Sequence, residues 1–220
     1  LFIKDPDNKG FVSWHQDAKY IGFEPHNWVT AWLAVTDANE ENGCMRMWAG
    51  THREKIREHK DTFNKSNLLT RGQTVQNVPL KDTVPNELKA GQLSLHHPMI
   101  VHGSTPNRSN SRRIGFVIQS YIGTNVDQVI GKMYVQKVRG EDKHNYHEYS
   151  KIPSTLMGKN EIISQIELNV LLQIKAHKIN SDLEISSITK CYFCSESFTN
   201  CITISSKSNK HLISQKITQK

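Results

Sequence analysis

The stretch "GQLSLHHPMIVHGSTPNRSNSRRIGFVIQSYI", residues 91–122, places two apolar runs on either side of a loop of turn-forming residues. The runs at 91–97 and 113–122 have the length of β-strands, and "GSTPNRSNS" between them is rich in Gly, Pro, Asn and Ser. The same pattern occurs in "WVTAWLAVT", 28–36, and "CMRMW", 44–48, which "DANEENG" separates. Several short strands joined by such loops predict an all-β sandwich or barrel.

Two segments depart from this strand-and-turn pattern. "THREKIREHK", 51–60, opens with Thr51 and Glu54 at the spacing of a capping box and predicts a helix. Residues 61–90, which lead into the turn-rich "VPNELKAG" at 84–91, show no strong period. We expect them to form a long insertion that acts as a lid or binding loop.

The composition of the chain changes near residue 150. The first 150 residues hold all four tryptophans, 11 of the 12 glycines and six of the seven prolines, whereas Ile, Ser, Lys and Asn dominate the rest. Apolar residues within 160–178 recur at helical spacing. We therefore expect a core domain at 1–150 and a divergent region at 151–220 that is helical at first and then disordered.

Bulk properties exclude several classes of function. The 220 residues carry a formal charge of +7. The basic residues do not form a dense stripe with interleaved aromatic residues, so the sequence does not predict nucleic-acid binding. No apolar run approaches the roughly 18 residues of a membrane helix. One of the four cysteines lies in the first 150 residues, which favours a reducing compartment, the cytoplasm by default. Because the sequence begins with Leu1, we expect a fragment whose targeting signal is not readable.

Three side chains form a candidate metal site. "FVSWHQDAKY", 11–20, has the composition of a strand, so His15 and Asp17 are expected on the same face. His102 follows an apolar run and precedes a Gly-Ser turn. Two imidazoles and one carboxylate on a β-scaffold are the ligand set of non-haem Fe(II) oxygenases.

Arg113 is a candidate anchor for a dicarboxylate. It lies 11 positions after His102, across the turn loop. A guanidinium binds a carboxylate through two parallel hydrogen bonds, so one dicarboxylate could contact both the metal and Arg113. The alternative is that Arg113 is a surface residue beside Arg112, and strand alternation allows only one of the two to face inward.

Four stretches of the chain carry a resemblance to a known family: "WHQD", "TAWLAV", "NGCMRMWAGTHR" and "LHHPMIVHGSTPNRSNSRRIGFVIQSY". Over about residues 5–140 the sequence resembles the phytanoyl-CoA dioxygenase family of Fe(II)- and 2-oxoglutarate-dependent oxygenases. The resemblance implies an all-β double-stranded β-helix, or jelly roll, with minor helices. Family members begin well before the His-x-Asp motif, so we expect the jelly roll to be incomplete at its N-terminus.

The resemblance also implies roles for six residues. The iron ligands would be His15, Asp17 and His102. The 2-oxoglutarate pocket would be formed by Trp32, Ser104 and Arg113.

The activity implied by the resemblance is hydroxylation of a small organic or acyl-CoA-type substrate, with O2 as oxidant and succinate and CO2 as products. Ascorbate is a further candidate cofactor. A related halogenase is one alternative, which Asp17 disfavours because halide needs a small residue in place of the carboxylate. A metal-binding or non-catalytic remnant of the same fold is the other alternative.

Other histidines and cysteines are weaker candidates. His96 and His97 are interpreted as packing residues or as residues that support the site. Cys191 and Cys194, with Cys201 and His211 downstream, could form a zinc site, but their uneven spacing argues against it.

Overall fold

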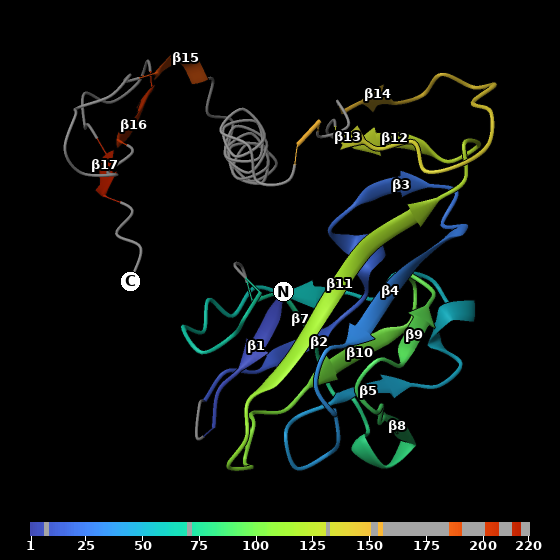
Figure 1. The fold of residues 1–220 in the computed structure, drawn as a ribbon, viewed down its shortest axis with the longest axis vertical. Coiled ribbons are helices and arrows are strands. Elements are labelled where there is room, and N and C mark those ends of the chain that lie inside the picture. The colour runs from blue at the N-terminus through green and yellow to red at the C-terminus, as the bar shows by residue number, and fades with distance from the viewer. Residues whose placement is uncertain are drawn as a thin grey trace. The chain divides into compact units, whose positions relative to one another are not determined.

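The apolar runs of residues 1–122 fold into two four-stranded antiparallel sheets (Figure 1). One sheet has the order β1-β11-β4-β9, with β1 at Phe2–Lys4, β11 at Arg113–Ile122, β4 at Trp28–Ala34 and β9 at Leu93–His96. The other has the order β2-β10-β5-β8, with β2 at Val12–His15, β10 at Val101–Ser104, β5 at Met45–Trp48 and β8 at Thr83–Asn86. The expected all-β jelly roll is confirmed.

This computed structural model describes residues 1–6, 9–69, 72–130, 133–150 and 154–155, together with three strands between 185 and 216. The chain divides into two compact units, Leu1–Lys151 and Ile152–Lys220. In the second unit, β15 (Ile185–Lys190), β16 (Cys201–Ser206) and β17 (Ile213–Lys216) form an antiparallel sheet. The helix predicted at 160–178 lies outside the described residues, as do Cys191, Cys194 and His211.

Short elements complete the first unit. β3 (Gly22–Glu24) pairs with β12 (Asp127–Ile130), β6 (His59–Lys60) with β7 (Thr74–Val75), and β13 (Tyr134–Val135) with β14 (Glu148–Tyr149). The described residues also form three 3-10 turns: η1 (Asp17–Lys19), η2 (Thr51–Arg53) and η3 (Leu80–Asp82). Among the described residues, no helix has the length and apolar character needed to cross a lipid bilayer.

Side-chain alternation along β4 explains why this run is a central strand. Trp28, Thr30, Trp32 and Ala34 point inward and are all buried. Trp32 packs so closely on β11 that a Cβ atom at Gly115 would lie 2.0 Å from its Cζ2 atom. Glycine has no Cβ atom, so it leaves room at this position for the indole ring in the core.

The helix predicted over 51–60 is wrong. Only the single turn η2 forms, and the chain is extended from Glu54 onward. The reason is a set of bonds to the fully buried Gln16. Its side-chain Oε1 accepts the Arg57 N–H at 2.8 Å, and its own N–H donates to Nε2 of His59 at 3.0 Å. These tertiary bonds outweigh the local capping signal.

Two other boundaries differ from the sequence-based expectation. The strand predicted over 11–20 ends at His15, because the turn η1 begins at Asp17 and the Ala18 N–H donates to the Pro98 carbonyl. Residues 83–86, expected to belong to a loop, form strand β8. Its Pro85 is tolerated because β8 lies at the edge of its sheet.

Candidate active site

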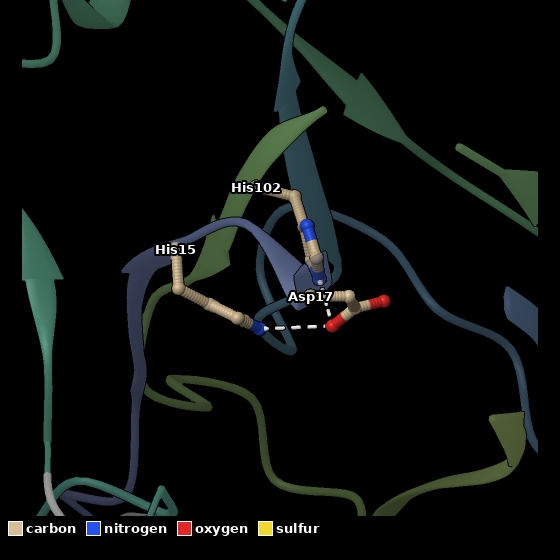
Figure 2. A group of neighbouring side chains, drawn as sticks. All are labelled: His15, Asp17 and His102. Atoms are coloured by element: carbon tan, nitrogen blue, oxygen red, sulfur yellow. Dashed lines mark ion pairs between the residues drawn. The ribbon is translucent and has the colours of Figure 1, made fainter. Parts of the chain in front are cut away.

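His15, Asp17 and His102 converge inside the jelly roll (Figure 2). His15 and His102 are directly opposite each other on β2 and β10, with ring centroids 4.2 Å apart. Their Nε2 atoms lie 3.5 Å and 3.9 Å from Oδ1 of Asp17, and the potential ligand atoms are all within 4.8 Å of one another. A single metal ion could contact all three side chains.

Backbone carbonyls orient both imidazoles. Nδ1 of His15 lies 2.8 Å from the Ser13 carbonyl oxygen, and Nδ1 of His102 lies 3.1 Å from that of Ile100. A carbonyl only accepts hydrogen bonds, so each Nδ1 carries a proton, and in a neutral imidazole Nε2 is then the nitrogen with the lone pair. Both lone pairs are therefore available for metal coordination.

The protonation states suit a metal site. Burial lowers the pKa of His102 to about 3, with a further contribution from His15, so this imidazole is neutral at pH 7. Burial alone would raise the pKa of Asp17, but the polar contacts of its carboxylate with the His15 and His96 rings, each at 3.5 Å, hold it well below its usual value. A second imidazole beside the neutral His102 and the ionised carboxylate completes a donor set that fits Fe(II).

Arg113 is also buried in the interior. Its side chain is 1% exposed, its guanidinium lies 5.4 Å from the Trp32 ring, and its Nε has no hydrogen-bond partner among the described residues. Arg112, in contrast, is exposed and pairs with Asp5. The two arginines therefore face opposite sides of β11, with Arg113 inside.

Lys4 is a buried cation that the sequence reasoning missed. Its Nζ donates to Oγ of Ser104 at 2.7 Å, to the Gly43 carbonyl at 3.2 Å and to the Thr105 carbonyl. Burial, followed by the nearby charge of Arg113, lowers the pKa of Lys4 to about 7. In the polar segment "IKDPDNK" a lysine is read as a surface residue. Only the pairing of β1 with β11 places it opposite Arg113.

Thr30 and His96 complete the surroundings of Asp17. Oγ1 of Thr30 donates to Oδ2 of Asp17 at 2.7 Å, and Nε2 of His96 lies 3.5 Å from the same oxygen. Thr30 reads as an ordinary strand residue in the sequence, and no sequence pattern distinguishes His96 from its neighbour His97. The strand register of β4 and β9 is the signal that brings them together.

The model of the phytanoyl-CoA dioxygenase family, PhyH, matches residues 1–115, which include all six predicted site residues and Lys4. The chain belongs to this family. Its members are 2-oxoglutarate-dependent non-haem oxygenases.

Individual relatives each match about half of the chain. "Phytanoyl-CoA dioxygenase domain-containing protein 1" of Danio rerio is 34% identical over 117 residues, which are 50% of this chain and 39% of that protein. "Probable alpha-ketoglutarate-dependent hypophosphite dioxygenase" of Stutzerimonas stutzeri is 27% identical over 131 residues, 57% of this chain and 44% of that protein. The chain thus spans about two fifths of the length of these curated relatives.

A solved structure supports the fold. The apo form of the non-heme monooxygenase ThoJ superposes with a TM-score of 0.68 at 26% sequence identity, covering 80% of this chain and 64% of that one. This likeness supports the jelly-roll fold.

Proposed function

We propose that this chain carries the active site of an Fe(II)- and 2-oxoglutarate-dependent dioxygenase that hydroxylates a small organic or acyl-CoA-type substrate. The observation that carries the proposal is that one β-scaffold holds the cluster of His15, Asp17 and His102 together with two buried cations, Arg113 and Lys4. The family membership supports the same reaction class.

His15, Asp17 and His102 would hold the iron. Bound iron would supply the oxidative chemistry in which O2 gives one oxygen atom to 2-oxoglutarate, releasing succinate and CO2, and the other to a C–H bond of the substrate. The protein's contribution is to hold two imidazole nitrogens and one carboxylate oxygen in place, in the protonation states that metal binding requires. Nδ1–H bonds to the Ser13 and Ile100 carbonyls serve this purpose.

The distal carboxylate of 2-oxoglutarate would be anchored by Arg113, and Lys4 would add a second positive charge. The unpartnered Nε of Arg113 supplies a free donor, and the positive charges complement the anion. Because the Ser104 hydroxyl accepts its bond from Lys4, its own hydrogen remains free to donate to the co-substrate. Trp32 would form an apolar wall that excludes water.

The proposed substrate is a small molecule. The names of the two relatives range from phytanoyl-CoA to hypophosphite, which supports a small-molecule partner and a broad range of candidates. Asp17 argues for hydroxylation rather than halogenation, since it fills the position that halide would need. We also propose a reducing, cytoplasmic location on the basis of cysteine usage, with ascorbate as an auxiliary cofactor to be tested.

An assay of succinate release tests the function. The protein is loaded anaerobically with Fe(II) and 2-oxoglutarate, exposed to O2 in the presence of a panel of acyl-CoA thioesters and small metabolites, and compared with Asp17→Ala. We expect succinate from the unchanged chain and background levels from the variant. Iron binding with no succinate from any mixture would favour the metal-binding remnant.

A further inference from the structure

The two oxygens of the Asp17 carboxylate lie in different surroundings. Oδ1 faces the Nε2 atoms of His15 and His102, whereas Oδ2 accepts the Thr30 hydroxyl and lies 3.5 Å from Nε2 of His96. Figure 2 shows both dashed lines meeting at one oxygen while the other oxygen points away from the two imidazoles. The carboxylate therefore has one side for a metal and one side for the protein.

Strand register produces this division. His15 and His102 are cross-strand partners on β2 and β10 of one sheet. Thr30 and His96 are cross-strand partners on β4 and β9 of the other sheet. Asp17, in the turn after β2, places its carboxylate between these two pairs.

His96 has chemistry that the proposed function leaves unused. Its side chain is 3% exposed, and neither ring nitrogen has a hydrogen-bond partner among the described residues. Burying a polar group without a partner costs free energy, so such a group usually serves a purpose. The distance of 3.5 Å to Oδ2 is slightly longer than a normal N–H···O bond, so a small shift of either side chain would complete it.

We propose that His96 is a positioning residue whose Nε2–H, together with the Thr30 hydroxyl, holds Oδ2 of Asp17 so that only Oδ1 is offered to the metal. The inference rests on the proposed metal site. A carboxylate that binds through one oxygen leaves three of six coordination positions for 2-oxoglutarate and O2. Coordination through both oxygens would occupy one of these positions.

A direct ligand role for His96 is less consistent with the geometry. Among the described residues, the group whose ligand atoms lie within 4.8 Å of one another comprises His15, Asp17 and His102. His96 contacts the carboxylate on the opposite oxygen from the other two imidazoles. It is therefore placed to act through Asp17.

Substitutions at His96 test the inference through Mn(II) binding, measured by electron paramagnetic resonance. His96→Phe keeps an aromatic ring but removes the donor, and we expect Mn(II) affinity to fall roughly 10- to 100-fold, the usual effect of losing a partner of a metal ligand. His96→Gln keeps an N–H donor, and we expect it to restore most of the affinity. His97→Phe is the matched control on the adjacent, half-buried residue and should bind Mn(II) like the unchanged chain.

Pulsed electron paramagnetic resonance of the Cu(II)-loaded protein provides a second readout by counting coordinated imidazoles. We expect two in the unchanged chain and two in His96→Phe. Three imidazoles falling to two would overturn the inference, because His96 would then be a ligand.

Unaltered Mn(II) affinity in His96→Phe would also overturn the inference. A loss of Mn(II) affinity in His96→Gln as large as that in His96→Phe would also overturn it. If His96→Phe does not fold, His96→Gln still decides the test. If the unchanged chain binds no Mn(II) or Fe(II), the proposed function itself fails, which is a distinguishable result.

Discussion

Lys4 and Arg113 lie directly opposite each other on the antiparallel strands β1 and β11, and each is only 1% exposed. Two cations buried side by side repel each other and lose hydration, which destabilises the folded chain unless Lys4 loses its proton or an anion joins them. This pairing is the strongest indication in the structure that the interior is built to receive a carboxylate.

Arg113→Lys should weaken 2-oxoglutarate binding. The substitution keeps the charge but loses the planar two-bond contact, and charge-assisted hydrogen bonds contribute about 1.5–3 kcal/mol each, so we expect a loss of roughly ten- to a hundredfold. The measurement is a titration of 2-oxoglutarate against the charge-transfer band of the anaerobic Fe(II) complex. Arg112→Lys, on the exposed side of β11, is the control. Equal behaviour of the two variants would remove Arg113 from the anchor role.

The affinity for 2-oxoglutarate should depend on pH through Lys4. The pKa of Lys4 is lowered from 10.5 to about 7 by burial and by Arg113, so the group loses its charge as pH rises through this value. An anion favours the charged form, and binding should therefore weaken above pH 7, by up to about tenfold per pH unit if one proton is taken up on binding. Lys4→Met should bind more weakly at pH 6 and show a flat profile from pH 6 to 8.5. A profile of the same slope in both proteins would contradict this assignment.

Gly115→Ala should displace the Trp32 ring. The added Cβ would lie 2.0 Å from Cζ2 of the indole, so the ring or the β11 backbone must move. Overpacking of this kind costs about 1–3 kcal/mol. We expect a lower free energy of unfolding in urea, altered tryptophan fluorescence and weaker 2-oxoglutarate binding, because Trp32 lies against Arg113. An unchanged unfolding midpoint would show that the pocket is looser than the structure indicates.

Gln16→Leu should destabilise the turn between two proposed ligands. The side chain donates to the Met99 carbonyl at 2.7 Å and accepts the Arg57 N–H at 2.8 Å, and its loss leaves both backbone groups without these bonds. Leaving one buried backbone group unsatisfied costs about 1–3 kcal/mol, so we expect the free energy of unfolding to fall by at least this amount. Glu54→Gln, which breaks a partly exposed ion pair with Arg57, should change it by less than about 1 kcal/mol. Similar changes in the free energy of unfolding for the two variants would argue against Gln16 as the residue that stabilises this turn.

The main strands and the neighbouring positions of His15 and Asp17 could be predicted because their signals are local. The apolar run at 113–122 becomes β11 over the same residues, and 28–36 contains β4. His15 and Asp17 are two residues apart, so they remain neighbours even though the strand ends between them.

The rest depended on contacts between segments far apart in sequence. The capping box at Thr51 yields one turn because Gln16, more than thirty residues earlier, binds the segment that follows. Pro85 suggested a loop because its place at a sheet edge is not visible in the sequence. Lys4 and His96 acquire their partners only through strand register, which no local pattern specifies.

The most direct test of the central claim is the stoichiometry and affinity of anaerobic Fe(II) binding to the unchanged chain and to His102→Ala. We predict one Fe(II) per chain, and a loss of affinity in the variant that exceeds the roughly 10- to 100-fold cost of removing a partner behind a ligand. His97→Ala, which leaves all three proposed ligands in place, should bind like the unchanged chain. Unchanged iron affinity in His102→Ala would contradict the assignment of His15, Asp17 and His102 as the metal site.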